Sequence, residues 1–554
     1  MDPVIVVGAG PVGLALALAL AAQDVPSVVL DEGSGDDGYR PARTVVLRTD
    51  TAAFTERLGC AGALRDEGVR WTGWRTMRRG QLVRHLSFAD APDEGTVDGD
   101  GGEGTGEGVA APLHVPQHAL AGALRAALAS PAAAGLVRIV TGCRVDAVEQ
   151  DAEGISAHTR GARATWWRGS HLVGCDGARS TVRKLLGIRF PGRTAVERHA
   201  VATLRAELPW PGEGVLHRRP PWRGGGDEVA ARPLPDGTWR LDWLLPPRGD
   251  MVTPEALVGR IRDTLSGWCG STPPYELIDT GVYTLHHRLA RRWRAGRAFL
   301  AGDAAHLLGA LGTQGLDEGL RDVENLAWKL ARAWHGGAPE ALLDSYQAER
   351  RAAVAARLRA ADQSLPALRG ESGLLTYLRG GSRGYDALLT DGHLGLGPLG
   401  APPAYPHSPL TPADVEDGVV IGTAPGAPVA DVPVTAPDGT AGRLRERLGR
   451  GVLVVLVAPG TGVWDRRHWV TAGVMPQLAE AVRTLPVPGE LLVAEAYPGA
   501  AAHTVLLVRP DGLLVAAFAG VHPAALRAAA EVLLGAAPGQ ATAECPAEEA
   551  ADAR

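Results

Sequence analysis

The chain has 554 residues, of which 45% are hydrophobic and 21% are charged, so it can bury large cores in more than one domain. Its net charge is −6 and its basic residues are spread along the sequence, which argues against nucleic acid as a partner. Five widely separated cysteines without a CxxC pair argue against a disulfide framework, a redox dithiol and a metal site, and they suit a reducing cytoplasm.

The first predicted element is a buried strand at Val4–Val7, which runs into a glycine-rich turn and a helix of leucine and alanine. Gly8 permits the tight turn, Gly10 lets the backbone approach a pyrophosphate, and Gly13 allows close contact between helix and strand. The start of the helix faces the phosphates, and a proline fits there because its missing N–H would be unpaired anyway. We therefore predict a dinucleotide site at Gly8, Gly10, Pro11, Val12 and Gly13.

A second predicted strand, Ser27–Leu30, ends in two carboxylates that can bond the ribose hydroxyls of an adenosine. Asp31 is our choice for this role, with Glu32 as the alternative. The apolar run 14–22 is too short to span a bilayer and no basic leader precedes the first strand, so we expect neither secretion nor membrane insertion. These residues indicate a bound nucleotide, but they do not separate FAD from NAD.

A second segment has a predicted strand at 171–173 that leads into the turn 174–180 and a helical pattern at 181–186. Asp176 and Ser180 are natural turn and cap residues, so a strand–turn–helix junction also accounts for them without a ligand.

A third segment repeats this form, with a predicted strand at 298–301 that ends in Gly302-Asp303. The carboxylate of Asp303 can accept hydrogen bonds from a sugar-alcohol chain. The sequence Gly312-Thr313-Gln314-Gly315 then opens a long predicted helix that begins at Leu316. A helix N-terminus carries partial positive charge, which would stabilise an anionic reduced flavin.

In order and spacing, the three segments resemble the class A flavoprotein aromatic hydroxylases, the p-hydroxybenzoate hydroxylase family, over roughly residues 1–390. The resemblance implies FAD as the resident cofactor, NADPH or NADH as a transient co-substrate, and O2 as the oxidant. It implies that Gly8, Gly10, Gly13 and Asp31 hold the ADP part of FAD, and that Asp176, Gly177, Arg179 and Ser180 form the family's DG motif for FAD and NAD(P)H. It further assigns Asp303 to the ribityl chain, Gly312, Gln314, Gly315 and Leu316 to the isoalloxazine, Arg43 to the mobile flavin, and Gln117 to the position after the substrate-domain insertion.

The sequence departs from that family at three places near the cofactor. Asp31-Glu32 replaces a Glu-Arg pair, Gly309-Ala310 replaces a Pro-Pro pair, and Asp317 stands where an asparagine is usual. The backbone around Gly309 and Ala310 would lie near the flavin carbon C4a, and we assign no catalytic side chain. A charge at Asp317 favours the helix dipole but opposes an anionic flavin.

A period-two run at 238–244 places Trp239, Leu241 and Trp243 on one face of a strand and Arg240 and Asp242 on the other. The aromatic face either covers a flat polycyclic ligand or packs the core of an antiparallel sheet, and core packing is the commoner arrangement.

Two further substrate candidates, Trp210 and Trp222, lie in segments rich in proline and glycine that are typical of loops. His286, His287 and His306 are possible acid–base groups, and structural roles are at least as common for such residues.

The fold that we expect is α/β, with an FAD-binding Rossmann-like domain of the glutathione reductase type, an inserted antiparallel-sheet substrate domain, and a C-terminal thioredoxin-like domain without CxxC. We assign 1–72, 113–180 and 281–395 to the first, 73–112 and 181–280 to the second, and 401–536 to the third, where Arg509-Pro510-Asp511-Gly512 signals a hairpin. The glycine-rich acidic stretch 90–108 and the tail 537–554 are predicted to be disordered.

The resemblance implies a monooxygenase that hydroxylates a phenolic, polycyclic aromatic substrate of polyketide type, as in antibiotic biosynthesis, through a flavin C4a-hydroperoxide. Baeyer–Villiger oxygenation of a polyketide ketone and a non-catalytic flavin- or ligand-binding protein are the alternatives. Flavin halogenation is disfavoured because no WxWxIP motif is present, and disulfide reduction because no dithiol follows the first glycine motif. We expect a monomer or a homodimer with a small aromatic substrate.

Overall fold

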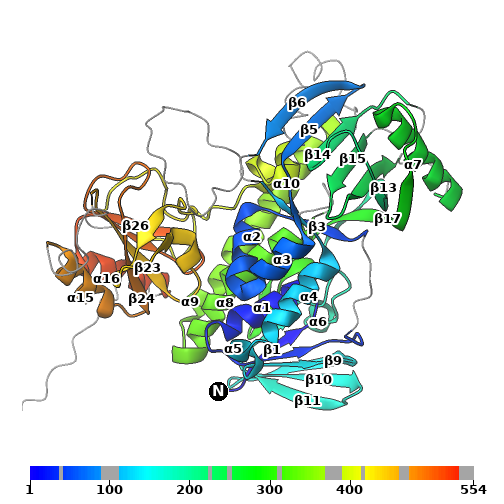
Figure 1. Ribbon diagram of the computed structural model, residues 1–554. Helices are drawn as coiled ribbons and strands as arrows, with labels where there is room; N and C mark the ends of the chain where they lie inside the picture. Colours follow the sequence, from blue (N-terminus) through cyan, green and yellow to red (C-terminus); the bar gives the residue numbers. More distant parts are fainter. Residues whose placement is uncertain are drawn as a thin grey trace, which may run out of the picture. The chain divides into compact units, whose positions relative to one another are not determined.

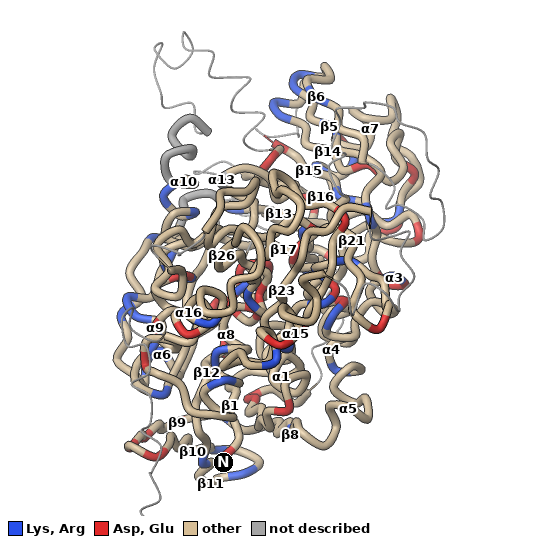
Figure 2. Tube along the Cα trace, turned by 90° about the vertical axis from the view of Figure 1, so that its left-hand side faces the viewer, with Lys and Arg blue, Asp and Glu red and all other residues tan. Residues whose placement is uncertain are grey.

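The computed structural model describes residues 1–35, 42–88, 111–222, 228–245, 252–308, 315–368, 390–412, 418–460 and 473–535. The chain divides into two compact units, one of Met1–Ala331 with Arg350–Pro402 and one of Arg332–Glu349 with Pro403–Arg554. Basic and acidic residues are interspersed along the elements (Figure 2). Within the described ranges, no helix is long and apolar enough to cross a bilayer. The acidic stretch 90–108 and the tail 537–554 lie outside the described residues.

The first unit contains a six-stranded sheet in the order β18-β19-β12-β1-β2-β8 (Figure 1). Its strands pair in parallel except β18 and β19, which are antiparallel. Because parallel strands end at one edge of a sheet, the turns after β1, β12 and β19 come together. The strands are β1 (Val4–Val7), β2 (Ser27–Leu30), β8 (Val137–Val140), β12 (Leu172–Gly174), β18 (Arg294–Ala295) and β19 (Ala298–Leu300).

Helix α1 (Pro11–Ala21) packs against this sheet and against α4 (Gln117–Leu128). A helix that is apolar all round is expected to be buried, and every residue of α1 except Val12 is buried. The other helical segments that begin in this unit are α2 (Thr49–Thr55), η1 (Glu56–Cys60), α3 (Ala61–Glu67), α5 (Pro131–Ala134), α6 (Thr181–Leu185), α7 (Pro254–Cys269), η2 (Gly302–Ala304), α8 (Gly315–Gly336), α10 (Ala352–Leu368) and α13 (Gly397–Gly400).

The same unit contains an eight-stranded sheet in the order β20-β17-β13-β16-β15-β14-β5-β6, in which only β14 and β5 pair in parallel. Helix α7 covers one face of it (Figure 1), over the apolar side chains of β16 that the period-two pattern predicted. The strands are β5 (Gly73–Arg78), β6 (Gln81–Ser87), β13 (Gly192–Ala206), β14 (Glu213–Arg218), β15 (Glu228–Pro233), β16 (Thr238–Leu245), β17 (Tyr275–Leu289) and β20 (His306–Leu308).

Two three-stranded sheets complete the first unit. One has the order β3-β7-β4, with β3 (Thr44–Leu47), β4 (Val69–Arg70) and β7 (Leu113–Pro116). The other has the order β11-β10-β9, with β9 (Cys143–Gln150), β10 (Ile155–Gly161) and β11 (Thr165–Gly169). The predicted α/β fold with an inserted, mostly antiparallel sheet is therefore confirmed.

The second unit is built on a six-stranded sheet in the order β22-β21-β24-β23-β25-β26. The segment Arg509-Pro510-Asp511-Gly512 joins the antiparallel strands β25 and β26. The thioredoxin-like fold that the sequence indicates for residues 401–536 stays a prediction. The elements are α9 (Glu340–Tyr346), η3 (Gln347–Arg351), β21 (Pro433–Thr435), β22 (Ala441–Arg443), η4 (Leu444–Arg447), β23 (Val452–Val457), α15 (Met475–Arg483), β24 (Gly489–Ala494), β25 (Thr504–Val508), β26 (Leu514–Ala519) and α16 (Pro523–Leu533).

Candidate functional site

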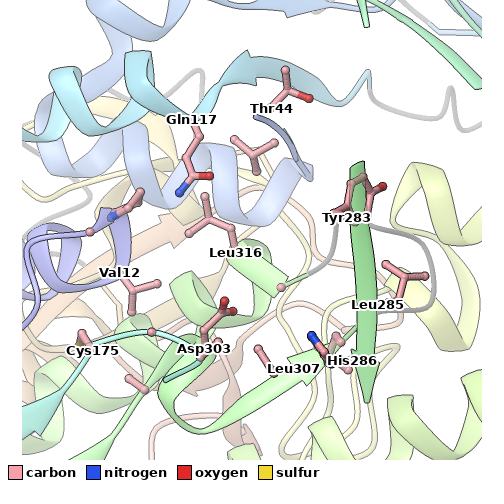
Figure 3. Close-up of a pocket in the computed structure, with 18 of the residues that line it drawn as sticks. Val12, Thr44, Gln117, Cys175, Tyr283, Leu285, His286, Asp303, Leu307 and Leu316 are labelled. Atoms are coloured by element: carbon pink, nitrogen blue, oxygen red, sulfur yellow. The ribbon is translucent and has the colours of Figure 1, made fainter. Parts of the chain in front are cut away.

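A cavity of about 460 Å³ lies where the turns after β1, β12 and β19 meet (Figure 3). Small-molecule sites in proteins have volumes of roughly 300–1,000 Å³, so the cavity is of the right size for a ligand. The three turns contribute Gly10, Pro11, Val12, Cys175, Gly177, Ala178, Ala301 and Asp303, and the start of α8 contributes Gly315 and Leu316. The tertiary structure thus brings the three sequence segments to one place.

The glycines of the first turn are required by its geometry. Gly8 has a φ of +106°, and a Cβ there would lie 2.5 Å from the carbonyl oxygen of Cys175. A Cβ on Gly13 would lie 2.0 Å from the carbonyl oxygen of Gly8. A Cβ on Gly10 would meet nothing within 4 Å, so the backbone there is open to a ligand. No side chain caps the N-terminus of α1, and its first N–H groups can therefore bind an anion such as a phosphate.

Asp31 lies at the end of β2, beside the first turn. Its Oδ2 accepts a hydrogen bond from the backbone N–H of Ala9 at 2.6 Å, and its Oδ1 accepts one from Gly33 at 2.7 Å. Each carboxylate oxygen keeps a further lone pair for a sugar hydroxyl. The side chain of Glu32 is 72% exposed and lies 3.8 Å from Arg144. The geometry therefore favours Asp31 over Glu32 as the ligand of a ribose.

Asp176 follows β12, and its two carboxylate oxygens differ in their hydrogen bonds to the described residues. Its Oδ2 accepts hydrogen bonds from the backbone N–H groups of Thr181 at 2.6 Å and Val182 at 2.9 Å, which caps α6. Its Oδ1 is buried and has no hydrogen-bond partner among the described residues. Asp176 itself is not among the residues that line the cavity, although its neighbours Cys175 and Gly177 are. Of the other residues of the predicted motif, Gly177 lines the cavity, Arg179 is exposed and Ser180 is a buried helix cap.

Asp303 reaches into the cavity from the turn after β19 (Figure 3). Its side chain is open to solvent there, yet the dense protein around it desolvates the carboxyl group and raises its pKa, against the opposing charge of His306. A hydrogen bond fixes the backbone of this turn, because the N–H of Gly302 donates to Oδ2 of Asp322 at 2.9 Å. A carboxyl group in this position can exchange hydrogen bonds with ligand hydroxyls.

Two residues assigned by resemblance alone meet at the start of α4. Gln117 lines the cavity, and its backbone N–H donates to the carbonyl oxygen of Arg43 at 2.9 Å. The side chain of Arg43 is exposed and is not among the residues that line the cavity. The predicted positions Gly309, Ala310, Gly312 and Gln314 lie outside the described residues.

The wall across the cavity from the first turn comes mainly from the eight-stranded sheet, and sequence reasoning missed most of it. Tyr283 presents its ring to the cavity, while its hydroxyl donates to Oδ2 of Asp242 at 2.9 Å. Burial, together with that carboxylate, raises the pKa of Tyr283. His286 is the one residue of this wall that the sequence had singled out. The remaining residues are Thr284 and Leu285 of β17, Leu307 and Leu308 of β20, and Thr44 and Val45 of β3.

The four tryptophans named as substrate candidates pack into the core between the sheet and α7. Trp239 and Trp243 are 3% and 0% exposed, and the indole N–H of Trp243 donates to a threonine hydroxyl of α7 at 3.0 Å. Trp210 and Trp222 stand edge-on to Trp268, with ring centroids 5.9 and 6.2 Å away. None of the four is among the residues that line the described cavity, so the structure favours the packing interpretation.

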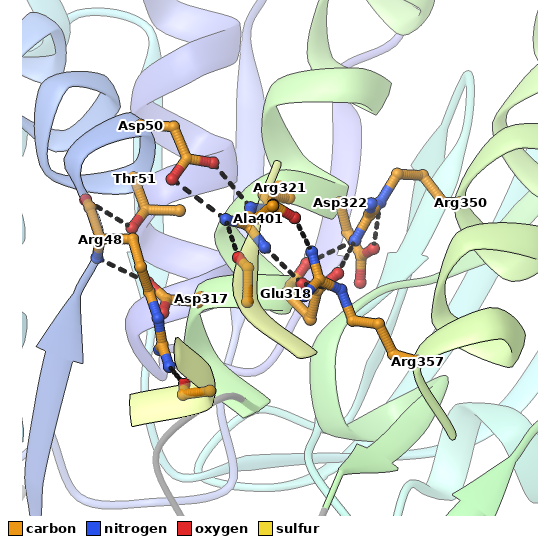
Figure 4. A network of polar contacts seen from close by, with 12 residues as sticks. Arg48, Asp50, Thr51, Asp317, Glu318, Arg321, Asp322, Arg350, Arg357 and Ala401 are labelled. Carbon is orange, nitrogen blue, oxygen red and sulfur yellow. Dashed lines mark hydrogen bonds and ion pairs between the residues drawn. The ribbon is translucent and has the colours of Figure 1, made fainter. Parts of the chain in front are cut away.

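The first turns of α8 carry a buried network of ion pairs (Figure 4). Arg321 donates to Asp50 at 2.7 Å and to Glu318 at 2.6 Å. Arg350 donates to Glu318 at 2.6 Å and to Asp322 at 2.8 Å. Burial alone would raise the pKa of Glu318, but the surrounding guanidinium groups outweigh it and hold that pKa well below its usual range. We call these residues, Asp50, Glu318, Arg321, Asp322, Arg350 and Arg357, the α8 network.

Asp317 also lies in the first turn of α8, where the sequence departs from the resembled family. It forms a buried ion pair with Arg48 and accepts a hydrogen bond from Oγ1 of Thr51 at 2.5 Å. Burial raises the pKa of Asp317, while Arg48 opposes that shift. The charge of Asp317 is therefore compensated within the protein by Arg48.

A family model described as the FAD binding domain matches residues 1–361, which include all three turns of the cavity. The chain belongs to this FAD binding domain family, and the relatives that it matches include aromatic hydroxylases. The predicted family and its FAD cofactor are confirmed, and NAD(P)H and O2 are the usual co-substrates of this hydroxylase family.

Three relatives show how far the likeness extends. Dialkyldecalin synthase of Streptomyces rugosporus is 31% identical over 528 residues, which are 93% of this chain and 95% of that protein. A 3-(3-hydroxy-phenyl)propionate/3-hydroxycinnamic acid hydroxylase of Mycolicibacterium smegmatis is 31% identical over 358 residues, which are 63% of this chain and 58% of that protein. The crystal structure of aklavinone-11 hydroxylase with FAD and aklavinone has a TM-score of 0.70 at 23% identity, with 97% of this chain and 99% of that chain covered. This last likeness shows the fold.

The residues around the cavity fit the FAD of this hydroxylase family. The open backbone at Gly10 and the uncapped start of α1 suit a pyrophosphate. The carboxyl group of Asp303 offers a further polar contact in the cavity. Gly315, at the N-terminus of α8, also lines the cavity, and a helix N-terminus carries partial positive charge.

Proposed function

We propose that the protein is an NAD(P)H-consuming monooxygenase that hydroxylates a phenolic, polycyclic aromatic substrate of polyketide type. The observation that carries the proposal is the composition of the cavity. One wall is formed by the three turns that the sequence predicts to bind a nucleotide and by the start of α8, and the other mainly by residues of β17 and β20, which include Tyr283, Leu285 and His286. A ring held against the second wall would face the redox-active end of a cofactor held against the first.

Each wall has a separate task in this proposal. Backbone N–H groups after Gly10 would bind the pyrophosphate, Asp31 the ribose, and Asp303 the ribityl chain. When bound, FAD would supply the electron storage and oxygen activation that side chains cannot supply. Tyr283 and Leu285 would orient the aromatic ring and exclude water from it.

On the wall formed by β17 and β20, which we call the substrate wall, His286 would act as the acid–base group. Its Nδ1 lies 3.1 Å from Oγ1 of Thr194, which orients the imidazole. The other ring nitrogen can then accept the proton of a substrate hydroxyl group. Removing that proton makes the ring more electron-rich, which favours attack of the ring on an electrophilic oxygen.

The direct test is an oxygen-labelling experiment with the FAD-loaded protein and a panel of polycyclic phenols. The proposal expects a yellow protein, faster NAD(P)H oxidation when a phenol is added, and one atom of ¹⁸O from ¹⁸O2 in a hydroxylated product. An ester or lactone that carries the label would instead indicate Baeyer–Villiger oxygenation. Binding of FAD without NAD(P)H oxidation under any substrate would indicate a flavin- or ligand-binding protein.

A second candidate is a ring-forming reaction, and a specific observation favours it. The match to dialkyldecalin synthase covers 93% of this chain and therefore includes both compact units. Closing a decalin from a linear polyene forms carbon–carbon bonds without net oxidation. Incubation of the FAD-loaded protein with a linear polyene in the absence of NAD(P)H and O2 separates the two candidates. A product of unchanged mass supports ring formation, and a gain of one oxygen atom that requires NAD(P)H supports the monooxygenase.

A further inference from the structure

A buried histidine binds the hydroxyl group of a residue that lines the cavity. His114 of β7 is fully buried, and both of its ring nitrogens have a partner. Its Nδ1 lies 2.7 Å from the carbonyl oxygen of Pro233, and its Nε2 lies 2.8 Å from Oγ1 of Thr44. Thr44 is the first residue of β3, is half-buried and lines the cavity (Figure 3). The side chain of Thr44 therefore connects the core to the cavity.

The imidazole of His114 is neutral at physiological pH. Burial lowers the pKa of His114 to about 3, and the charges of Arg232 and Arg240 act in the same direction. The hydrogen bond to Pro233 favours the protonated form but is outweighed. A neutral imidazole has one N–H donor and one nitrogen that can only accept.

The carbonyl group of Pro233 decides which nitrogen of His114 carries the proton. A carbonyl oxygen can only accept a hydrogen bond, so the proton must lie on Nδ1. The other tautomer would place two lone pairs against each other at 2.7 Å. Nε2 is then an acceptor, and its partner, the hydroxyl group of Thr44, must be the donor.

This direction of the hydrogen bond fixes what Thr44 can offer to a ligand. A threonine hydroxyl has one proton and two lone pairs, and it usually donates or accepts as its surroundings require. Here the proton is engaged by His114, which is the one hydrogen-bond partner of Oγ1 among the described residues. The oxygen of Thr44 can therefore accept a hydrogen bond from a ligand in the cavity, but it cannot donate one.

An acceptor of this kind distinguishes between oxygen groups of similar size. A hydroxyl group of a ligand can donate to Oγ1 of Thr44, whereas an ether, a ketone or a phenolate would bring a lone pair against it. Two groups in this cavity could act as the donor, an O–H of the substrate or an N–H of the flavin. Thr44 lies across the cavity from the first turn, on the same side as Tyr283, which favours the substrate.

We propose that Oγ1 of Thr44 accepts a hydrogen bond from a hydroxyl group of the substrate, and that His114 is the positioning residue that makes Thr44 an acceptor. The inference rests on the proposed function in one respect, namely that the cavity holds a phenol. It narrows the substrate to polycyclic phenols with two hydroxyl groups. One would give its proton to His286, and the other would stay protonated and bind Thr44.

The test compares ligands that differ by one hydrogen-bond donor, namely the symmetric 1,5-, 2,6- and 2,7-naphthalenediols and the monomethyl ether of each. Their dissociation constants are measured by isothermal titration calorimetry with the FAD-loaded protein, which reports binding whether or not a reaction follows. A hydrogen bond between neutral groups corresponds to about a three- to tenfold preference, so at least one diol should bind that much more tightly than its ether.

Substitutions of Thr44 assign the preference to its hydroxyl group. Thr44→Val keeps the shape of the side chain but has no acceptor, and it should bring the affinities of diol and ether to within about twofold of each other. Thr44→Ser retains the hydroxyl group and should keep the preference. Thr165→Val, at the exposed first residue of β11, is the matched control and should also keep it.

A substitution of His114 tests the positioning role while Thr44 is retained. His114→Leu removes the acceptor Nε2, so the hydroxyl group of Thr44 is free to donate to the oxygen of an ether. The preference for the diol should then fall, although the residue that contacts the ligand is unchanged. A purely structural role of His114 would weaken the binding of diol and ether equally.

FAD content and melting temperature verify that each variant is folded. Thr44→Val leaves Nε2 of His114 buried without its donor, which lowers stability. If this variant loses FAD, Thr44→Ala replaces it, because the smaller side chain leaves room for a water molecule that can donate to Nε2.

Failure of every diol to bind, equal affinity for diol and ether in all pairs, or a preference that survives both Thr44→Val and Thr44→Ala would overturn the assignment of Thr44. Weaker FAD binding in Thr44→Val with an unchanged preference would also overturn it, because the donor would then be an N–H of the flavin. The proposed function is judged separately by NAD(P)H oxidation and oxygen incorporation. A protein that prefers the diol through Thr44 but never oxidises NAD(P)H keeps this assignment and loses the monooxygenase.

Discussion

Oδ2 of Asp322 accepts two hydrogen bonds at once, one from the backbone N–H of Gly302 at 2.9 Å and one from Nε2 of His306 at 2.8 Å. The other oxygen of Asp322 accepts from Arg350 at 2.8 Å. One fully buried carboxylate therefore connects the turn that carries Asp303 to the ion pairs of α8. This arrangement couples the shape of the flavin site to the stability of the core beneath it.

We expect Asp322→Asn to lower both stability and FAD affinity. The change leaves Arg350 as a buried charge with one carboxylate fewer, which typically costs about 3–5 kcal/mol. The same change weakens the hydrogen bond from the backbone N–H of Gly302 to residue 322, which fixes the turn that carries Asp303. Urea unfolding of the apoprotein and FAD titration measure the two effects. Glu324→Gln on the same helix is the control, since its partly exposed pair with Arg57 should contribute less than about 1 kcal/mol. Unchanged FAD affinity in Asp322→Asn would show that the turn carrying Asp303 does not depend on the α8 network for FAD binding.

Asp31→Ala should weaken FAD binding by about tenfold or more, because a charged hydrogen-bond acceptor at the ribose and the brace on the first turn are lost together. The adjacent substitution Glu32→Ala should leave the affinity within about twofold, because that side chain is 72% exposed. Titration of both apoproteins with FAD, followed by flavin fluorescence, gives the comparison. A larger loss in Glu32→Ala than in Asp31→Ala would reverse the assignment.

The α8 network predicts a stability that declines in acid. The folded pKa of Glu318 lies well below its unfolded value of about 4.3, so the folded state binds fewer protons near that pH. Its contribution is complete above the unfolded pKa and is lost as the pH falls through the folded one. Glu318→Gln should be less stable at pH 7 by about 3–5 kcal/mol and should lose less stability on acidification.

Urea midpoints between pH 7 and pH 3 provide the measurement for Glu318. Glu67→Gln, at an exposed position at the end of α3, is the control and should keep the wild-type acid dependence. Parallel pH profiles for wild-type and Glu318→Gln would show that Glu318 does not carry the effect.

Trp243→Phe distinguishes a core residue from a ligand-binding residue. The indole is fully buried and donates to Oγ1 of Thr264 at 3.0 Å, so its loss should cost about 1–3 kcal/mol of stability. Binding of a polycyclic phenol to the folded protein should not change. Trp166→Phe, at a 48% exposed position, should change stability by less than about 0.5 kcal/mol. A stable Trp243→Phe protein with impaired ligand binding would instead indicate that Trp243 contacts the substrate.

The sequence by itself determined the nucleotide-binding half of the cavity. The patterns that predicted it are local: a buried apolar strand, a turn whose glycines permit close backbone contacts, and a helix. Each of the three turns is identified by a few consecutive residues. The resemblance of the three segments to one family predicted that they form a single site, and the parallel strands, which end at one edge of their sheet, bring the three turns together.

Only the tertiary structure decided the other half. Arg48 and Asp317 are 269 positions apart, Asp50 and Arg321 are 271 apart, and Asp242 and Tyr283 are 41 apart. The sequence showed that Arg240 and Asp242 share a face of β16, but not that Arg232 would stand opposite Arg240. Charges pair by distance in space, and no periodicity records which distant strand or helix will supply the partner. The packing of α2 beside α8 and the order and register of the strands made these contacts.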